Sequence, residues 1–193
     1  VTNGAIKINN KDIRDYDLLD LRDHLGVIPQ KAILFSGTIK DNIRFGKKDA
    51  TDDEIEHAVK IAQAYDFIMA KEHGFDEEIS EGATNVSGGQ KQRLSIARAL
   101  VRKAPIYIFD DSFSALDFKT DAILRKELKK EMSNSIMLVV AQRISSIMDA
   151  DQIIVLNEGK VVGHGTHQQL LKECKIYYEI AISQLSEEEL AHE

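Results

Sequence analysis

Apolar and polar residues follow two recurring patterns along this chain, one typical of buried strands and one typical of amphipathic helices. Residues 26–30, 106–109 and 136–141 are short apolar runs, and such runs predict strands that are buried on both faces. Residues 51–62 and 87–101 carry their apolar side chains at helical spacing. Strands that alternate with helices in this way predict an α/β fold, with a mostly parallel sheet and helices on both faces.

Two of the helices have clear starting signals. Thr51 followed by Glu54 has the spacing of a capping box, and Ser87 is a favourable N-cap for the second helix. Weaker patterns predict further elements. These are a strand at 5–9, helical turns at 20–25, a helix at 117–132, a short helix that ends at 147, a hairpin formed by 153–156 and 160–162, and helices at 166–173 and from 176 onward.

Composition and charge narrow the function classes. The net charge of −7 argues against nucleic acid as the main partner, because phosphate backbones are bound by a basic field. The single cysteine, Cys174, can form no disulfide within the chain, which suits a reducing compartment. No apolar run approaches the ~20 residues that cross a bilayer, so work at a membrane would depend on another domain or chain. We expect His164 and His167 to lie at the surface.

The first candidate for chemistry is a pair of carboxylates, Asp110 and Asp111, directly after the apolar run 106–109. The carboxyl edge of a parallel sheet is where α/β proteins place their ligands. One aspartate at this edge can hold Mg²⁺, and the next can orient an attacking water. The alternative is a loop that merely begins with acidic residues, and the pair alone does not decide between them.

The second candidate is the glycine turn at the start of the helix near residue 87. Ser87 can cap this helix, and Gly88 and Gly89 let the backbone approach a ligand closely. Free amides at a helix start, together with the helix dipole, form an anion site. The alternative is an ordinary capped helix with a glycine turn.

The order of these features is more specific than any one of them. Residues 86–117 resemble, in sequence order, the signature motif, the Walker B strand and the D-loop of ATP-binding-cassette (ABC) proteins. The resemblance covers essentially the whole chain. It includes the Q-loop at 27–30, the exporter-like residues 34–43, the loop at Glu81 and Gly82, the strand end at 139–143, and the C-terminal hairpin and helix at 159–171.

This resemblance implies a P-loop-NTPase-like fold with an additional α-helical subdomain. Residues 1–30 and 104–193 would form the core sheet and the C-terminal helices, and residues 31–103 the helical subdomain. The resemblance also implies ATP and Mg²⁺ as cofactors. It implies a transmembrane domain as partner, and therefore a place on the cytoplasmic face of the cell membrane.

The resemblance assigns a role to each matching residue. Asp110 and Gln30 would coordinate Mg²⁺, Asp111 would act as the base for water, and Gln142 would contact the γ-phosphate. The remaining residues would act across a dimer of two such domains. Ser87, Gly88, Gly89 and Gln90 would bind the ATP of the partner domain, and Asp117 would cross the interface.

Three features depart from the family pattern. No G-x-x-x-x-G-K-[ST] phosphate loop occurs, so we expect a chain truncated just before Val1; the alternative is a natural short form that binds no nucleotide. Asp111 stands where the family usually has glutamate, and a carboxylate withdrawn by about 1 Å can cost roughly 100-fold in rate. Gln142 stands where the family has a histidine, and glutamine cannot take on a proton.

Both substitutions weaken the same composite site, whereas Ser87, Gly88 and Gly89 match the family. We therefore expect an ATP-hydrolysing motor domain of an exporter that pairs with a different second domain as a heterodimer, whose signature completes the partner's site. One alternative is a nucleotide-binding regulatory subunit with little turnover. Another is a non-transport ABC ATPase that acts on nucleic acid or ribosomes, which the exporter-like residues 34–43 disfavour.

Residues 1–193 alone should bind ATP poorly, because the sequence lacks the phosphate loop and its lysine. Titration calorimetry with ATP and Mg²⁺ measures this directly. A sub-millimolar dissociation constant would show the prediction to be wrong.

Overall fold

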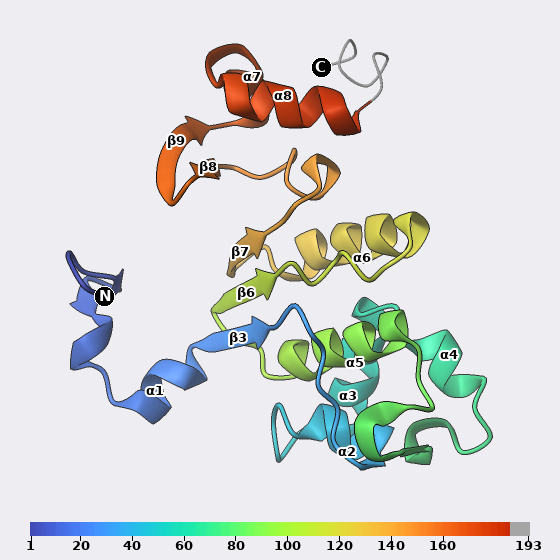
Figure 1. Cartoon of the computed structure of the whole chain (residues 1–193). Helices are drawn as coiled ribbons and strands as arrows, with labels where there is room; N and C mark the ends of the chain where they lie inside the picture. Colours follow the sequence, from blue (N-terminus) through green and yellow to red (C-terminus); the bar gives the residue numbers. More distant parts are fainter. Residues whose placement is uncertain (186–193) are drawn as a thin grey trace. The chain divides into compact units, whose positions relative to one another are not determined.

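Figure 1 shows the computed structural model of the chain, which describes residues 1–185. They form two compact units that divide between Val140 and Ala141, and each unit is considered by itself. The helix expected from 176 onward would also include residues 186–193, which lie outside the described residues.

Strands and helices are interspersed along the chain, although consecutive strands and consecutive helices also occur. The strands are β1 (Lys7–Ile8), β2 (Lys11–Asp12), β3 (Leu25–Ile28), β4 (Gly37–Thr38), β5 (Glu78–Ile79), β6 (Ile106–Asp110), β7 (Ile136–Val140), β8 (Ile153–Asn157) and β9 (Lys160–Gly165). The α-helices are α1 (Leu18–Asp23), α2 (Ile39–Arg44), α3 (Asp52–Ile61), α4 (Tyr65–Met69), α5 (Gly88–Leu100), α6 (Phe118–Glu131), α7 (His167–Glu173) and α8 (Lys175–Gln184). Single 3₁₀ turns are η1 (Ile13–Asp15), η2 (Gly74–Asp76), η3 (Glu81–Ala83) and η4 (Ile144–Ser146).

Three parallel strands form the largest sheet of the first unit, in the order β3-β6-β7 (Figure 1). In the register, Val27 pairs with Ile108, and Ile108 pairs with Leu138. The chain reaches β6 through α5 and reaches β7 through α6, which is the connection that parallel strands require. The α/β fold with a parallel sheet is therefore confirmed.

The two faces of this sheet differ in burial. Ile28, Tyr107 and Phe109 are buried on one face, in the same core as Leu94 of α5 and Leu124 of α6. The opposite row is open. Its most exposed members are Val27, Ile136, Leu138 and Val140, with exposed fractions of 53%, 65%, 53% and 51%. Within residues 1–140 the helices thus cover one face of the sheet, because successive crossovers turn in the same right-handed sense. The prediction that these strands are buried on both faces is therefore not met in this unit, most clearly for β7.

Capping boxes start three of the helices in the first unit. Thr38, Thr51 and Ser87 each accept a hydrogen bond from the backbone of the third helical residue, whose side chain bonds back to the cap. The two starting signals expected at Thr51 and Ser87 are confirmed. These bonds satisfy amides at the helix start that have no partner within the helix.

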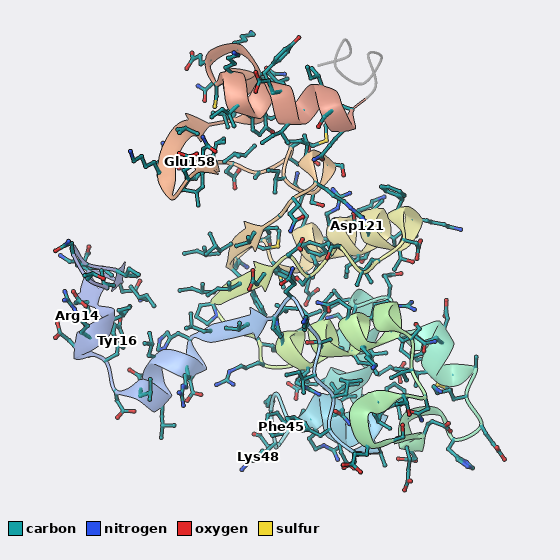
Figure 2. All side chains as sticks on the ribbon, viewed as in Figure 1. Arg14, Tyr16, Phe45, Lys48, Asp121 and Glu158 are labelled. Atoms are coloured by element: carbon teal, nitrogen blue, oxygen red, sulfur yellow. The ribbon has the colours of Figure 1, made fainter. Side chains whose placement is uncertain are left out.

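The second unit contains the antiparallel hairpin of β8 and β9 and the helices α7 and α8. Glu158 and Gly159 have φ angles of 48° and 74°, as a type I′ turn requires, and Figure 2 labels Glu158 at this turn. The prediction that His167 lies at the surface is wrong. Its ring is 4% exposed and Nδ1 lies 2.6 Å from the hydroxyl of Tyr177, because α7 and α8 pack together over a common core.

Two of the weaker predictions were inaccurate in length or type. The strand expected at 5–9 is reduced to Lys7–Ile8, because only these two residues pair with β2. The short helix expected to end at 147 is a single 3₁₀ turn, Ile144–Ser146.

Helix α2 approaches α5 so closely that the two backbones touch. Gly46 follows α2, and a Cβ atom at this position would lie 2.0 Å from the carbonyl oxygen of Arg98. Only a residue without a side chain allows this approach.

Gly46→Ala should therefore lower the free energy of unfolding by about 1–3 kcal/mol, the usual effect of an overpacked core position. Urea denaturation of residues 1–193 measures the change. Gly88→Ala is the matched control, because a Cβ at Gly88 would meet nothing within 4 Å. Equal stability of the two variants would contradict the close approach.

Candidate nucleotide-binding site

Gln30 and Asp111 meet at the carboxyl edge of the parallel sheet. They are 81 positions apart in the sequence, and the Nε2 amide of Gln30 donates a hydrogen bond of 3.0 Å to Oδ2 of Asp111. The pairing of Ile28 with Phe109 brings them together, because each residue follows its strand by a short step. Asp110, exposed at the end of β6, lies at the same edge, so the three residues expected to form a site are gathered there, and their roles stay a prediction.

The backbone of Asp111 is held in an unusual conformation. Its φ angle of 45° lies in the left-handed region, which aspartate tolerates better than most residues. The N–H of Asp111 donates to the carbonyl of Val140 at 2.9 Å, and the hydroxyl of Ser114 donates to the carbonyl of Asp111 at 2.8 Å. These bonds fix the direction in which the carboxylate leaves the sheet.

The oxygen atoms at this edge fit a magnesium ion that is bound mainly by water and phosphate. Asp110 offers an exposed carboxylate, and Gln30 offers the carbonyl oxygen of its amide. Magnesium is usually held by one or two carboxylates together with water and substrate phosphates. Within the described part of the chain, no group of three or more His, Cys, Asp or Glu residues could hold a metal ion by itself.

Ser87 and Gln90 form the capping box of α5 and are engaged with each other. The backbone N–H of Gln90 donates to Oγ of Ser87 at 3.2 Å, and the backbone N–H of Ser87 donates to Oε1 of Gln90 at 3.0 Å. The spacing S-x-x-Q was the available signal, and the role of Gln90 in the cap was missed. Gly88 and Gly89 then remain as the backbone donors that a phosphate could approach.

The two glycines differ in their surroundings. A Cβ at Gly88 would meet nothing within 4 Å, whereas a Cβ at Gly89 would lie 3.3 Å from the carbonyl oxygen of Ala115. Gly88 therefore leaves room for a ligand, and Gly89 allows α5 to pack against the loop that precedes α6. Asp117 caps α6 in that loop, and hydrogen bonds from the backbone N–H and the hydroxyl of Thr120 lower the pKa of its carboxyl.

Gln92 and Arg93 hold α5 in place and were not expected as site residues. Gln92 is 2% exposed and donates to the carbonyl of Pro29 at 3.2 Å, directly before Gln30. Arg93 donates to the carbonyl of Gln63 at 2.6 Å and stacks over the ring of Phe67. A polar residue on the apolar face of the helix, one turn before Ile96, was the signal that could have identified Gln92.

Gln142 belongs to the second unit, where its backbone is held by Gln184. The side-chain amide of Gln184 donates to the carbonyl of Gln142 at 2.8 Å and accepts from the N–H of Ile144 at 2.9 Å. The side chain of Gln142 is exposed. Gln184 was another residue that the sequence did not single out.

Comparison with known proteins identifies the class. The family model described as ABC transporter matches residues 1–114. This chain therefore belongs to the ABC transporter family, and it is an ATP-binding domain of that family.

Several exporters and flippases are similar to this chain. The structure of a bacterial Atm1-family ABC exporter with ATP bound superimposes with a TM-score of 0.92 and 37% identity, covering 96% of this chain and 33% of that chain. An ATP-dependent lipid A-core flippase of Syntrophus aciditrophicus is 40% identical over 193 residues, which cover all of this chain and 32% of the flippase. A multidrug export ATP-binding/permease protein of Staphylococcus aureus is 42% identical over 177 residues, which cover 92% and 31%.

The chain thus spans about a third of the length of the curated relatives that it matches. Among residues 1–185, no helix combines the length and apolar character needed to cross a membrane.

The capping box of α5 should contribute measurably to stability. Ser87→Ala removes the acceptor for the Gln90 amide, and the free energy of unfolding should fall by about 1 kcal/mol, as at other helix caps. Thr51→Ala, which opens the capping box of α3, should have an effect of the same size. Urea denaturation measures both, with the exposed Ser36→Ala as a reference; a Ser87→Ala variant as stable as this reference would contradict the prediction.

Proposed function

We propose that this chain is the ATP-hydrolysing motor domain of an ABC exporter, with a weakened site of its own and an intact signature motif for a partner domain. The observation that carries this proposal is the meeting of Gln30 with Asp111 beside Asp110, at the carboxyl edge of the β3–β6 pair. That arrangement combines a metal-binding carboxylate, an amide and a second carboxylate able to orient water.

Each residue at this edge has a distinct task. Asp110 and the amide oxygen of Gln30 would hold Mg²⁺, and bound Mg²⁺ supplies positive charge that stabilises a transferring phosphoryl group. Asp111 would orient water and accept its proton. Its carboxylate is one methylene shorter than that of glutamate, so water would be held less well and turnover would be slow.

The signature motif, which matches the family and would serve the partner domain, lies at the start of α5. Ser87 fixes the first turn through its capping box, and the amides of Gly88 and Gly89 are the donors for the γ-phosphate of ATP in the partner. The open space at Gly88 supports such an approach. Asp117, which caps α6, would face the same interface.

The partners follow from the relatives. Exporters and flippases carry membrane-spanning parts, and we propose that this chain works with such a transmembrane domain, at the cytoplasmic face of the cell membrane. Residues 31–103 would form its helical subdomain, and residues 1–30 and 104–193 its core. The substitutions at Asp111 and Gln142 favour a heterodimer, since a partner with intact residues would supply most of the hydrolysis.

A second candidate is a regulatory subunit that binds nucleotide and hydrolyses little. The contact that favours it is the hydrogen bond from Gln30, which engages the carboxylate of Asp111. This candidate differs from the first in one respect only, which is whether the domain regains turnover when the two departing residues are restored.

The steady-state ATPase rate of the complete exporter polypeptide, without a partner, tests the proposal. The parent should be nearly silent, whereas an Asp111→Glu, Gln142→His double variant should reach the ~1–1000 per second that is common for enzymes. This gain is expected because the longer carboxylate reaches the water and the imidazole can carry charge.

A control double variant, Asp49→Glu with Gln168→His, makes the same chemical changes at exposed positions and should remain silent. Turnover by the parent at an ordinary rate would remove the argument for a weakened site. A silent Asp111→Glu, Gln142→His variant would favour the regulatory subunit.

A further inference from the structure

Arg98, on the last turn of α5, holds a segment that lies far from it in the sequence. Its Nε donates to the carbonyl of Asn42 at 2.8 Å, its Nη1 to the carbonyl of Ile33 at 2.7 Å, and its Nη2 to Oδ1 of Asn42 at 2.8 Å. One planar guanidinium group thus forms hydrogen bonds with both ends of the segment from residue 33 to residue 42. A fork of fixed donors is the property that distinguishes arginine from lysine.

Asn42 extends these hydrogen bonds to other residues of the segment. Its side chain is 2% exposed, and it donates to the carbonyls of Phe35 and Thr38 at 2.9 and 3.0 Å. Its Oδ1 accepts from the N–H of Phe35 at 2.9 Å as well as from Arg98. A buried polar network of this kind specifies one arrangement of the backbone, because each broken bond leaves a polar atom unsatisfied.

The same guanidinium group underlies a pair of exposed aromatic rings. The centroids of Phe35 and Phe45 are 4.8 Å apart, and the guanidinium carbon of Arg98 lies 5.2 and 5.8 Å from them. Phe35 is 47% exposed and Phe45, labelled in Figure 2, is 64% exposed. Arg98 therefore fixes the base of an aromatic surface through cation–π contacts.

Backbone contact reinforces the connection. The carbonyl of Arg98 lies against Gly46, directly after Phe45, and Gln92 grips Pro29 from the same helix. Helix α5 rises about 1.5 Å per residue, so Arg98 stands roughly 16 Å along the axis from the cap at Ser87. Helix α5 thus has the glycine turn at its start, and its last turn contacts the aromatic pair of Phe35 and Phe45.

We propose that Arg98 is a positioning residue that makes the segment from Ile33 to Phe45 and the Ser87 end of α5 move as one body. A displacement of the exposed rings would then reach the glycine turn through the helix. This inference rests on the proposed function, in which Arg98 would pass movement from a partner surface to the signature motif. Among the contacts that join the segment to the helix, the proposal assigns the positioning role to the three hydrogen bonds of the Arg98 side chain.

Distances between spin labels in the complete polypeptide test the proposal, without ATP. The labels replace the exposed Ser36 and the half-buried Lys91, after the other cysteines, including Cys174, have been substituted. With Arg98 present, the distance distribution should be narrow. Arg98→Met should broaden it at least twofold, because methionine fills the space but makes none of the three hydrogen bonds.

Arg98→Lys should also broaden the distribution, because an ammonium group lacks the fixed fork. Should Arg98→Met fail to fold, the lysine variant decides the question. Arg102→Met is the matched control: it removes an ion pair with Asp23 from the neighbouring turn and should leave the distribution narrow.

A distribution that stays narrow in a folded Arg98 variant, with only a lower melting temperature, would overturn the proposal, since Arg98 would then stabilise without positioning. Broadening in the Arg102 control would overturn it also. The measurement needs no hydrolysis, so a failed ATPase prediction leaves this result interpretable, and a failed labelling result leaves the ATPase prediction intact.

Discussion

The parallel pairing of β3 with β6 is the constraint on which the candidate site depends. With Ile28 opposite Phe109, the chain leaves both strands at the same edge of the sheet, and Gln30 reaches Asp111 there. A register slip of one residue would turn the buried faces of the strands outward, so the packing of Tyr107 and Phe109 fixes the register. The geometry of the carboxylates is therefore a result of core packing.

Helix α5 links this edge to the rest of the first unit. The side chains of Ser87 and Gln90 are engaged in the cap, so the proposed contact with a phosphate would fall to the backbone of Gly88 and Gly89. Farther along, polar side chains tie the helix to the segment that contains the Q-loop. In this fold, therefore, hydrogen bonds from one helix help to set the positions of Gln30 and of the glycine turn, which are the two elements proposed to bind ligands.

The fold was largely predictable where the apolar pattern was strong. The runs at 106–109 and 136–141 correspond to β6 and β7, since continuous apolar runs of this length are typical of strands in a parallel sheet, although one face of β7 is exposed within residues 1–140. Local patterns failed where distant contacts decide: the strand at 5–9 extends only as far as its pairing allows, and His167 is buried by the packing of α7 on α8. Neither outcome could be predicted from the residues adjacent in the sequence.

The sequence by itself determined the class of protein, the order of its motifs and the chemical types at the edge of the sheet, because these depend on residue identity and local spacing. It also determined the two departures, Asp111 and Gln142. Only the tertiary structure decided that Gln30 bonds to Asp111 and that Arg98 grips the segment around Asn42. Such contacts join residues far apart in the chain, and their partners are selected by packing in three dimensions, which local spacing does not encode.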